Sequence, residues 1–500
     1  ETVEIYYGSY STVFGSDALA GVINIETKGY RQGELGSVSV KASANGMIGG
    51  VGYIGTQLGE NAEFNATGSY QNGDDSTFGD AFERTELLAS IRSVDTADSH
   101  WKLGLLYADG KAQSFPEDSG GDRLAVIRTP ENREFRQSNL SGMLQQQLSR
   151  RLGVKLHSAF SKREEDVSSP GIAPGVLDGV PAIDSQTKYR RLDVNTSINY
   201  LYSSTISGAL GIAYADEDGA MDSKIDFGFL VPADYNLRRK TESVFAELGL
   251  DMLAGVNITA GIRHDRADKI SVTTSRLIGR VQTGQDSLLS MQYSEGFKLP
   301  SFFALAHPFV GNSELRPERS ENYEFSLESH FLSGRLTTRT GVFQNTYRDL
   351  VDFDPIAFTN VNRSKVRARG AEELFAYQLT EQVDIEGQAS LLDLESNEAG
   401  VVLRRRPELK ASVLARYRPV DGLAITGRLM VNDSYHDSSI ATGMVKMAGF
   451  NRLDLSALWQ INPDLKLGLH IDNTLDNDHE ESVGFANRGR SVTIRASLNL

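Results

Sequence analysis

The chain has 500 residues, 40% of them hydrophobic and 23% charged, and its formal net charge is −15. The absence of cysteine excludes disulfide frameworks, thiolate metal sites and cysteine nucleophiles, and the acidic balance argues against a nucleic-acid partner. No run approaches the roughly 18 apolar residues of a transmembrane helix, and the mean hydropathy is −0.31. A membrane β-barrel leaves the same composition, because its strands alternate instead of forming apolar runs.

The N-terminal stretch differs from the rest of the chain. It is rich in small residues and turns, and it joins the first alternating segment through Gly33 and Gly36. We therefore expect residues 1–32 to form a small unit that precedes residues 33–500.

From residue 33 onward, apolar and polar residues alternate. In SVTIRASLNL (491–500) every second residue from Val492 is apolar, and the residues between are polar or charged. LKLGLHID (465–472) shows the same period of two, which is typical of strands with two different faces. The segments are about ten residues long, the length of a tilted membrane strand. The pattern predicts an all-β protein, a transmembrane antiparallel β-barrel of about 22 strands.

The expected strands follow one another at a spacing of about 21 residues. They begin near residues 36, 48, 62, 83, 100, 134, 152, 188, 204, 238, 256, 269, 286, 320, 334, 363, 381, 402, 422, 449, 463 and 489.

The connections between these strands sort into two classes that alternate along the chain. Short periplasmic turns alternating with long extracellular loops are typical of outer-membrane barrels. The tight connections are 59–61, 150–151, 203–204, 332–334, 420–422 and 462–464. The long ones are 72–82, 111–133, 163–187, 216–237, 297–319, 348–362, 433–448 and 474–488.

One long connection is unusually aromatic and proline-rich: SEGFKLPSFFALAHPFVGNSELRPERSENYEF (294–325). Its three prolines argue against a helix interior, and its irregularity argues against a central strand. We expect residues 297–319 to lie at the outer mouth, where proline lowers the ordering cost of capture and aromatic rings offer a hydrophobic face to a ligand. The alternative is that these side chains pack on neighbouring loops. The candidate ligand-binding residues are Phe297, Phe302, Phe303, His307 and Phe309.

Enzyme motifs are nearly absent. The sequence contains no G-x-S-x-G, no H-E-x-x-H and no Walker A loop. Its G-x-G-x-x-G at 50–55 lies in a strand pattern without the following helix of a dinucleotide site. The chain is therefore expected not to be an enzyme.

Two acidic stretches, NGDDSTFGD (72–80) and DEDGAMDSKID (216–226), fall in expected outer loops. Hard oxygen ligands on loops suit Ca²⁺, and the alternative is a solvated acidic rim. No other cofactor is expected. The candidate calcium ligands are Asp74, Asp75, Asp80, Asp216, Asp218 and Asp222.

The run Arg404-Arg405-Arg406 is expected to begin a strand at the outer rim. There it would bind lipopolysaccharide phosphates or an anionic ligand, or form a plain cluster of rim charges.

Several segments together resemble the TonB-dependent outer-membrane receptors. FGSDALAGVINIETK (14–28) is similar to the C-terminal part of that family's plug domain. The stretch 294–325 resembles its mid-barrel loop, and Asn312 of the GNSEL segment joins the candidate ligand-binding residues. NVNRSKVRARGAEE (360–373) and LDNDHEESVGFANRGRSV (475–492) match further segments, and the C-terminal part is most similar to cobalamin and siderophore receptors. The plug motif residues are Gly15, Ser16, Asp17 and Gly21.

The chain departs from the family pattern in two places. Tyr7-Gly8-Ser9 stands where family plugs often carry Arg-Gly-Pro, and Leu500 stands where family barrels usually end in an aromatic residue. In members of the family, most of the plug, including the segment that contacts TonB, precedes the position that corresponds to Glu1. The chain is therefore expected to be a fragment that does not support energised uptake by itself.

The resemblance implies active import of a scarce large nutrient across the outer membrane of a Gram-negative bacterium. The protein would be a monomeric multi-pass barrel among lipopolysaccharide, and the TonB–ExbB–ExbD complex would supply energy through the plug. A ferric siderophore or cobalamin is the expected ligand. Haem is an alternative, because His307 lies between FKLP (297–300) and NSEL (312–315), where haem receptors show paired boxes. A passive porin or an adhesin-type barrel is the other alternative.

Overall fold

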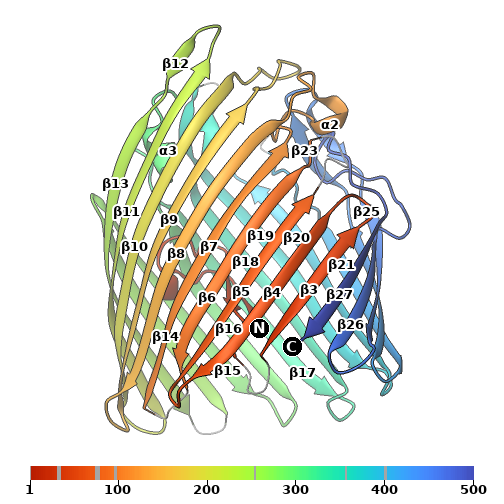
Figure 1. The fold of residues 1–500 in the computed structure, drawn as a ribbon. Coiled ribbons are helices and arrows are strands. Elements are labelled where there is room, and N and C mark those ends of the chain that lie inside the picture. Colours follow the sequence, from red (N-terminus) through yellow and green to blue (C-terminus); the bar gives the residue numbers. More distant parts are fainter. Residues whose placement is uncertain are drawn as a thin grey trace.

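The computed structural model describes residues 2–30, 35–73, 79–94, 98–252, 255–354, 357–398 and 402–500. Within these ranges, 22 antiparallel strands form a closed barrel in which each strand pairs with its neighbour in the chain (Figure 1). The last strand pairs with the first barrel strand, for example Ala496 with Val40, and this pairing closes the ring. The expected all-β barrel is thereby confirmed.

The barrel strands are long and nearly continuous along the chain. Their bounds are β3 (Gly36–Ser43), β4 (Ile48–Leu58), β5 (Ala62–Gly73), β6 (Phe82–Ser93), β7 (Ser99–Ser114), β8 (Glu131–Gln147), β9 (Leu152–Ser169), β10 (Ala182–Leu201), β11 (Ile206–Asp226), β13 (Tyr235–Met252), β14 (Val256–Ala267), β15 (Ile270–Gln282), β16 (Ser287–Lys298), β17 (Glu318–Phe331), β18 (Leu336–Asp354), β19 (Thr359–Gln378), β20 (Val383–Ser396), β21 (Leu409–Val420), β22 (Leu423–Asn432), β25 (Phe450–Gln460), β26 (Leu465–Asp472) and β27 (Ser491–Asn499).

The remaining elements are short. They are β1 (Thr2–Tyr7), β2 (Gly21–Glu26), β12 (Leu230–Pro232), β23 (Tyr435–Ser439), β24 (Gly443–Met447), α1 (Ser11–Phe14), α2 (Gly121–Leu124) and α3 (Phe302–Ala306). In the described part of the chain, no helix combines the length and the apolar character needed to cross a membrane.

Most strands begin close to where the alternation predicts, and β3, β4, β5, β9 and β14 begin at the predicted residue. The expectation that Arg404–Arg406 begin a strand is wrong, because β21 begins only at Leu409. Arg405 has a left-handed φ of 57°, and Pro407 cannot donate a ladder hydrogen bond, so the arginines lie in the β20–β21 loop.

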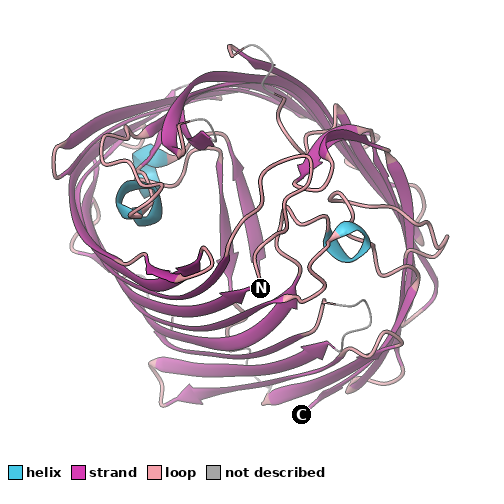
Figure 2. Cartoon of the chain, turned by 90° about the horizontal axis from the view of Figure 1, so that it is seen from above, coloured by secondary structure: helices cyan, strands magenta, loops and turns pink. Residues whose placement is uncertain are grey.

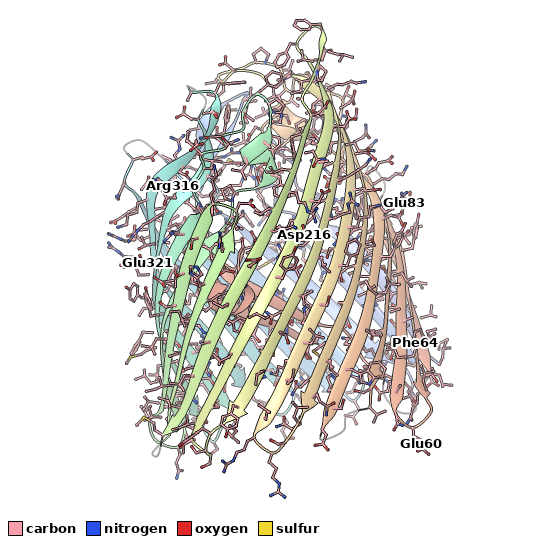
Figure 3. The ribbon with its side chains drawn as sticks, turned by 90° about the vertical axis from the view of Figure 1, so that its left-hand side faces the viewer. Glu60, Phe64, Glu83, Asp216, Arg316 and Glu321 are labelled. Carbon is pink, nitrogen blue, oxygen red and sulfur yellow. The ribbon has the colours of Figure 1, made fainter. Side chains whose placement is uncertain are left out.

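The two classes of connection lie at opposite ends of the barrel. Turns such as 332–335 and 461–464 gather at the lower end in Figure 1, and the connections that carry α2, α3 and the β23–β24 hairpin gather at the upper end. Figure 3 likewise shows Glu60 at a lower turn and Asp216 higher on the wall. Because outer-membrane barrels place short turns in the periplasm, the upper end is the extracellular mouth.

Three of the expected long loops are largely barrel strand. The predictions for 163–187 and 216–237 are wrong, because β9 runs to Ser169, β10 begins at Ala182 and β11 runs to Asp226. The prediction for 348–362 is wrong as well, because β18 runs to Asp354 and β19 begins at Thr359. The outward residues of β11 change from Leu210 and Ile212 to Asp216 and Asp218 as the strand rises. The strand therefore leaves the apolar belt of the membrane and continues into water. A strand whose outer face is polar is stable there, but its polar sequence resembles that of a loop.

The N-terminal segment lies inside the ring of strands. β1 and β2 form their own two-stranded sheet, and α1 contacts β14, β15 and β16. Figure 2, the view from above, shows the N-terminus within the barrel outline. The segment thus packs on the inner wall below the mouth loop that connects β16 to β17.

Candidate functional site at the outer mouth

The β16–β17 loop contains a short helix, which the sequence analysis did not predict. α3 fits between Pro300 and Pro308 because neither proline lies inside it. Ser301 caps the helix, and its side-chain oxygen accepts a hydrogen bond from the Ala304 N–H at 3.1 Å. The prolines therefore delimit a helical turn rather than exclude one.

The start of this loop is fixed to the tall strands β10, β11 and β13. The Arg239 guanidinium donates to the Pro300 carbonyl at 2.8 Å and to the Glu217 carboxylate at 2.9 Å, and it lies 4.8 Å from the centre of the Phe302 ring. Tyr189 donates its hydroxyl to Glu217 at 2.7 Å. Burial by itself raises the pKa of Glu217, but the hydrogen bonds from Arg239 and Tyr189 and the nearby guanidinium charges together outweigh it and hold the pKa below the ordinary value. The anchor is therefore a buried ion pair.

Gly219 makes room for the helix. A Cβ atom at this position would collide with the Phe302 ring, so only glycine lets α3 approach β11 this closely. The far side of the loop is held by amides: Asn312 donates its side-chain N–H to the Asn360 carbonyl at 2.9 Å, and the Asn360 backbone N–H donates to the Val310 carbonyl at 2.9 Å. The loop is thus tied to the barrel wall on both sides.

The structure divides the candidate aromatic residues into two groups. Phe297 and Phe302 are buried, with 1% and 7% of their surface exposed, and Phe297 packs on Ala267, Val272 and Leu299. Phe303 and Phe309 are 44% and 39% exposed. The two buried rings hold the loop in place, and the two exposed rings are available to a ligand.

The exposed rings belong to a row that the sequence analysis did not find. The Phe303 and His307 ring centres lie 4.6 Å apart, those of His307 and Phe309 6.0 Å, and those of Phe309 and Phe227 5.9 Å. Phe227 follows β11, and no local pattern in the sequence links it to a loop more than seventy residues away. We call Phe303, His307, Phe309 and Phe227 the aromatic row.

His307 is a buried member of this row, with 6% of its surface exposed. Its Nδ1 lies 3.3 Å from the backbone N–H groups of both Phe309 and Val310, from which it accepts. Burial lowers its pKa, so the ring is neutral at pH 7 and carries its proton on Nε2. A metal ligand needs a free lone pair, so coordination through Nε2 would cost these two hydrogen bonds.

Ser16 and Asp17 of the plug motif, together with Ser11, meet the base of the same loop. Ser11 and Ser16 accept hydrogen bonds from the backbone N–H groups of Phe297 and Leu299 at 3.0 and 3.1 Å, and the Asp17 N–H donates to the Phe297 carbonyl at 3.2 Å. We call these three bonds the latch.

Two glycines of the motif allow close approach around the latch. Gly15 has a φ of +78°, and a Cβ there would lie 3.1 Å from the Arg263 guanidinium. A Cβ on Gly21 would lie 2.9 Å from the Tyr6 carbonyl oxygen. The N-terminal segment is thereby packed closely against the wall that carries the loop.

The other half of the mouth is organised around Asp437 of β23, which is fully buried. Its carboxylate accepts from Arg404 at 2.8 Å, from Arg405 at 3.1 Å and from the Val483 backbone N–H at 3.1 Å. Arg404 also reaches Asp118 of the β7–β8 loop at 2.8 Å. Both arginines are therefore paired with loop carboxylates. Asp437 joins three loops directly, and Arg404 connects the β7–β8 loop to them.

The candidate calcium ligands are dispersed. Asp74 and Asp75 lie outside the described residues. Asp80 pairs with Arg488, and Asp216 and Asp218 lie on β11 rather than in a loop, where they pair with Arg238 and Arg190. Asp222 also lies on β11. Among the described residues no group of three or more His, Asp or Glu is placed to hold a metal ion, and calcium binding stays a prediction.

Below the mouth, the lumen contains a cavity of about 840 Å³ against β18–β22. Its lining mixes apolar side chains with charges of both signs, with Arg339, Arg428 and Arg452 beside Glu372 and Glu386. A large polar solute could be solvated along this wall.

A closed 22-stranded barrel with a structured extracellular mouth and an inner N-terminal segment defines an outer-membrane receptor and transporter. Residues 69–473 match the family model for the TonB dependent receptor-like β-barrel. The chain belongs to this family of outer-membrane proteins, which import nutrients.

Similar proteins have different ligands in their names. The vitamin B12 transporter BtuB of Photobacterium profundum is 24% identical over 99% of this chain and 79% of its own length. The copper transporter OprC has a similar structure, with a TM-score of 0.83, 16% identity and coverage of 100% of this chain and 85% of its own. So has the ferripyoverdine receptor of Pseudomonas aeruginosa, with a TM-score of 0.83, 14% identity and coverage of 100% and 76%. These relatives are transporters and receptors rather than enzymes, and the shared fold leaves the ligand open.

Proposed function

We propose that this receptor captures a ferric siderophore or a cobalamin at its outer mouth and imports it actively. The aromatic row carries the proposal. Its half-exposed rings Phe303 and Phe309 belong to a loop that is anchored on both sides, so little ordering entropy remains to be lost on binding. Large ligands with planar or apolar faces gain most from such a surface. The similarity to a vitamin B12 transporter and to a ferripyoverdine receptor supports these two ligand classes.

The import step is proposed to draw its energy from the TonB complex with ExbB and ExbD, acting through the N-terminal side of the chain. The latch joins this segment to the base of the ligand loop. Displacement of the segment would therefore pull on Phe297 and Leu299, which lead directly into α3. The cavity beside β18–β22, which carries charges of both signs among apolar side chains, offers a path for the released ligand.

Haem ranks behind these ligands in the proposal. An axial histidine must present an unprotonated nitrogen, and His307 uses Nδ1 to accept two backbone hydrogen bonds. A sharp change in the haem Soret band on mixing with purified protein, lost in His307→Ala, would reverse this ranking.

Binding of cyanocobalamin, a ferric catecholate and haem to detergent-purified protein tests the proposal. We expect saturable binding of one of the first two, weakened at least tenfold in Phe303→Ala/Phe309→Ala. Phe331→Ala is the matched control, because Phe331 is also half-exposed but lies at the periplasmic end. Uptake by cells that make the receptor from its own gene should stop when a protonophore removes the energy source. Flux that depends only on solute size and ignores the protonophore would instead indicate a passive porin.

A further inference from the structure

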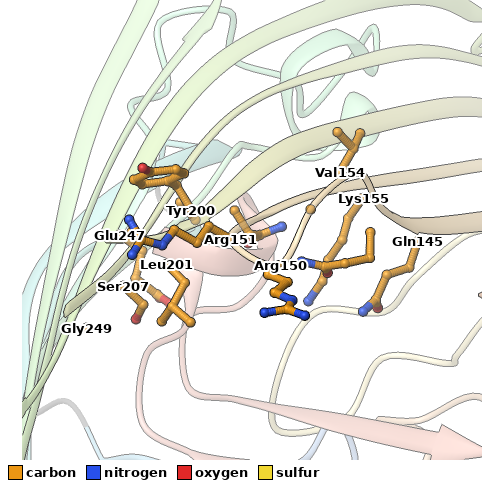
Figure 4. A pocket seen from close by; sticks show the side chains of 15 residues that line it. Gln145, Arg150, Arg151, Val154, Lys155, Tyr200, Leu201, Ser207, Glu247 and Gly249 are labelled. Carbon is orange, nitrogen blue, oxygen red and sulfur yellow. The ribbon is translucent and has the colours of Figure 1, made fainter. Parts of the chain in front are cut away.

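A polar pocket of about 320 Å³ lies at the periplasmic end of the barrel, at the opposite end from the aromatic row. Figure 4 shows the side chains that line it. Its lining comes from the lower ends of β8, β9, β10, β11 and β13. The cations Arg150, Arg151 and Lys155 all line it, together with Gln145 and Asn199.

The strand register places this pocket on the lumen side. Gln147, Gly153, Asn199, Ala209 and Glu247 form one row across neighbouring strands. Glu247 pairs at 2.6 Å with the guanidinium of Arg276. That guanidinium lies over the ring of Tyr10, which belongs to the inner N-terminal segment. The row therefore faces inward, and small residues within it leave the hollow.

The three cations of the pocket lack carboxylate partners in the described part of the chain. This distinguishes them from neighbouring arginines on the wall, such as Arg191, which pairs with Asp193 at 2.8 Å. The carboxylate that lines the pocket, Glu247, already forms an ion pair with Arg276. The Nδ2 of Asn199 is buried and donates to no described residue. The three cations are exposed to water but line one pocket. Like charges in one pocket without counter-charges repel one another, and a bound anion relieves that repulsion.

We propose that this pocket binds anionic groups, phosphate or carboxylate, of the cargo as it leaves the lumen for the periplasm. The inference rests on the proposed import function and adds a second, exit-side station to it. Arginine suits the task, because its planar fork of donors matches both groups, and Lys155 and Asn199 add further donors. Since the pocket is open to the lumen and near its end, we expect weak, salt-sensitive binding that permits release.

Direct binding tests the pocket independently of import. Inorganic pyrophosphate is titrated calorimetrically into the detergent-purified chain at low salt. We expect Arg150→Gln/Arg151→Gln/Lys155→Gln to weaken binding at least tenfold and Arg150→Lys/Arg151→Lys to weaken it less than threefold. The control Lys188→Gln/Lys224→Gln/Lys240→Gln removes the same charge from exposed positions on the upper strands and should change nothing. Equal pyrophosphate affinity in all variants would overturn the proposal.

Lipid phosphate is the other source of the same chemistry. If headgroups occupied the arginines, pyrophosphate binding would be lost in vesicles containing phosphatidylglycerol but retained in pure phosphatidylcholine. We expect equal binding in both, and loss in the anionic vesicles would reject the lumenal assignment.

Transport separates this inference from the function on which it rests. In cells that make the receptor from its own gene, the Gln variant should bind cargo at the surface with wild-type affinity but import it at least threefold more slowly than the wild type. If the wild type imports cargo and the Gln variant imports it at the same rate, the proposed anion-binding role of the pocket is refuted, and the proposed import function is not. Absence of energised import by the wild type would refute the proposed function, and the pyrophosphate titration would still decide the pocket.

Discussion

The side-chain oxygen of Ser16 accepts a hydrogen bond at 3.1 Å from the backbone N–H of Leu299, which lies 283 residues further along the chain. With the neighbouring bonds of Ser11 and Asp17, it attaches the N-terminal segment to the base of the ligand loop. Ser11, Phe297 and Leu299 are buried and Ser16 is half-buried, whereas Asp17 is exposed. The two serine bonds therefore satisfy backbone N–H groups that water hardly reaches.

The first prediction removes this latch. Ser11→Ala/Ser16→Ala should cost about 1 kcal/mol for each lost bond, because each leaves a buried backbone N–H without an acceptor. Amide hydrogen exchange of residues 9–21 and of 297–299 should accelerate together. Ser412→Ala, on the inner wall away from the latch, is the control. Exchange that accelerates in only one of the two segments would show that the latch does not couple them.

The second prediction concerns the anchor of α3. Glu217→Gln removes a buried carboxylate that pairs with Arg239 and Arg191, and leaving two guanidinium groups without it should weaken docking of the loop by about 3 kcal/mol. Limited proteolysis between residues 299 and 317 should become faster. Glu242→Gln, an exposed carboxylate on β13, should behave like the wild type.

The same anchor predicts a pH dependence. The pKa of Glu217 is lowered below its ordinary value of 4.5 in the folded protein, so its contribution is complete above that value and is lost as the pH falls through the lowered pKa. Protease resistance of the loop should therefore be constant from neutral pH to about pH 5 and decline in stronger acid. A decline between pH 8 and pH 6 would point to a different group.

The third prediction addresses the loop junction at Asp437. Asp437→Asn leaves Arg404 and Arg405 without their shared buried charge and should loosen all four attached loops by about 3 kcal/mol. Proteolysis on intact cells should accelerate in both the β7–β8 and the β26–β27 loops. Asp421→Asn, in the tight turn after β21, is the control. Cleavage confined to the loop that carries the substitution would contradict the shared junction.

The fourth prediction tests orientation. A protease site inserted after Gly228, in the turn beyond β11, or after Val176, between β9 and β10, should be cut on intact cells. One inserted between Ser203 and Ser204 should be cut only after the outer membrane is opened, because short turns face the periplasm. The reverse pattern would mean that the barrel is inverted.

The barrel itself was encoded locally. A period of two and turn residues at regular intervals are properties of neighbouring residues, and they were sufficient to predict 22 strands and to sort the connections by end. The segments that resemble the family could also be recognised from the sequence, because FGSDALAGVINIETK and GFKLP are each an unbroken run of residues. The sequence did not predict that β11 continues as a strand above the membrane. Its outward residues change from apolar to charged there, although the alternation continues with the same period.

The mouth was decided by tertiary structure. Phe302 and Phe303 are adjacent and chemically identical, yet one is buried against Gly219 and the other is exposed, and only the packing of α3 on β11 distinguishes them. Phe227 meets Phe309, and Asp437 meets Arg404, through contacts between loops that barrel closure brings together. The sequence determined the strands because hydrogen-bonded pairing follows local pattern, and the structure decided the site because its members meet only in space.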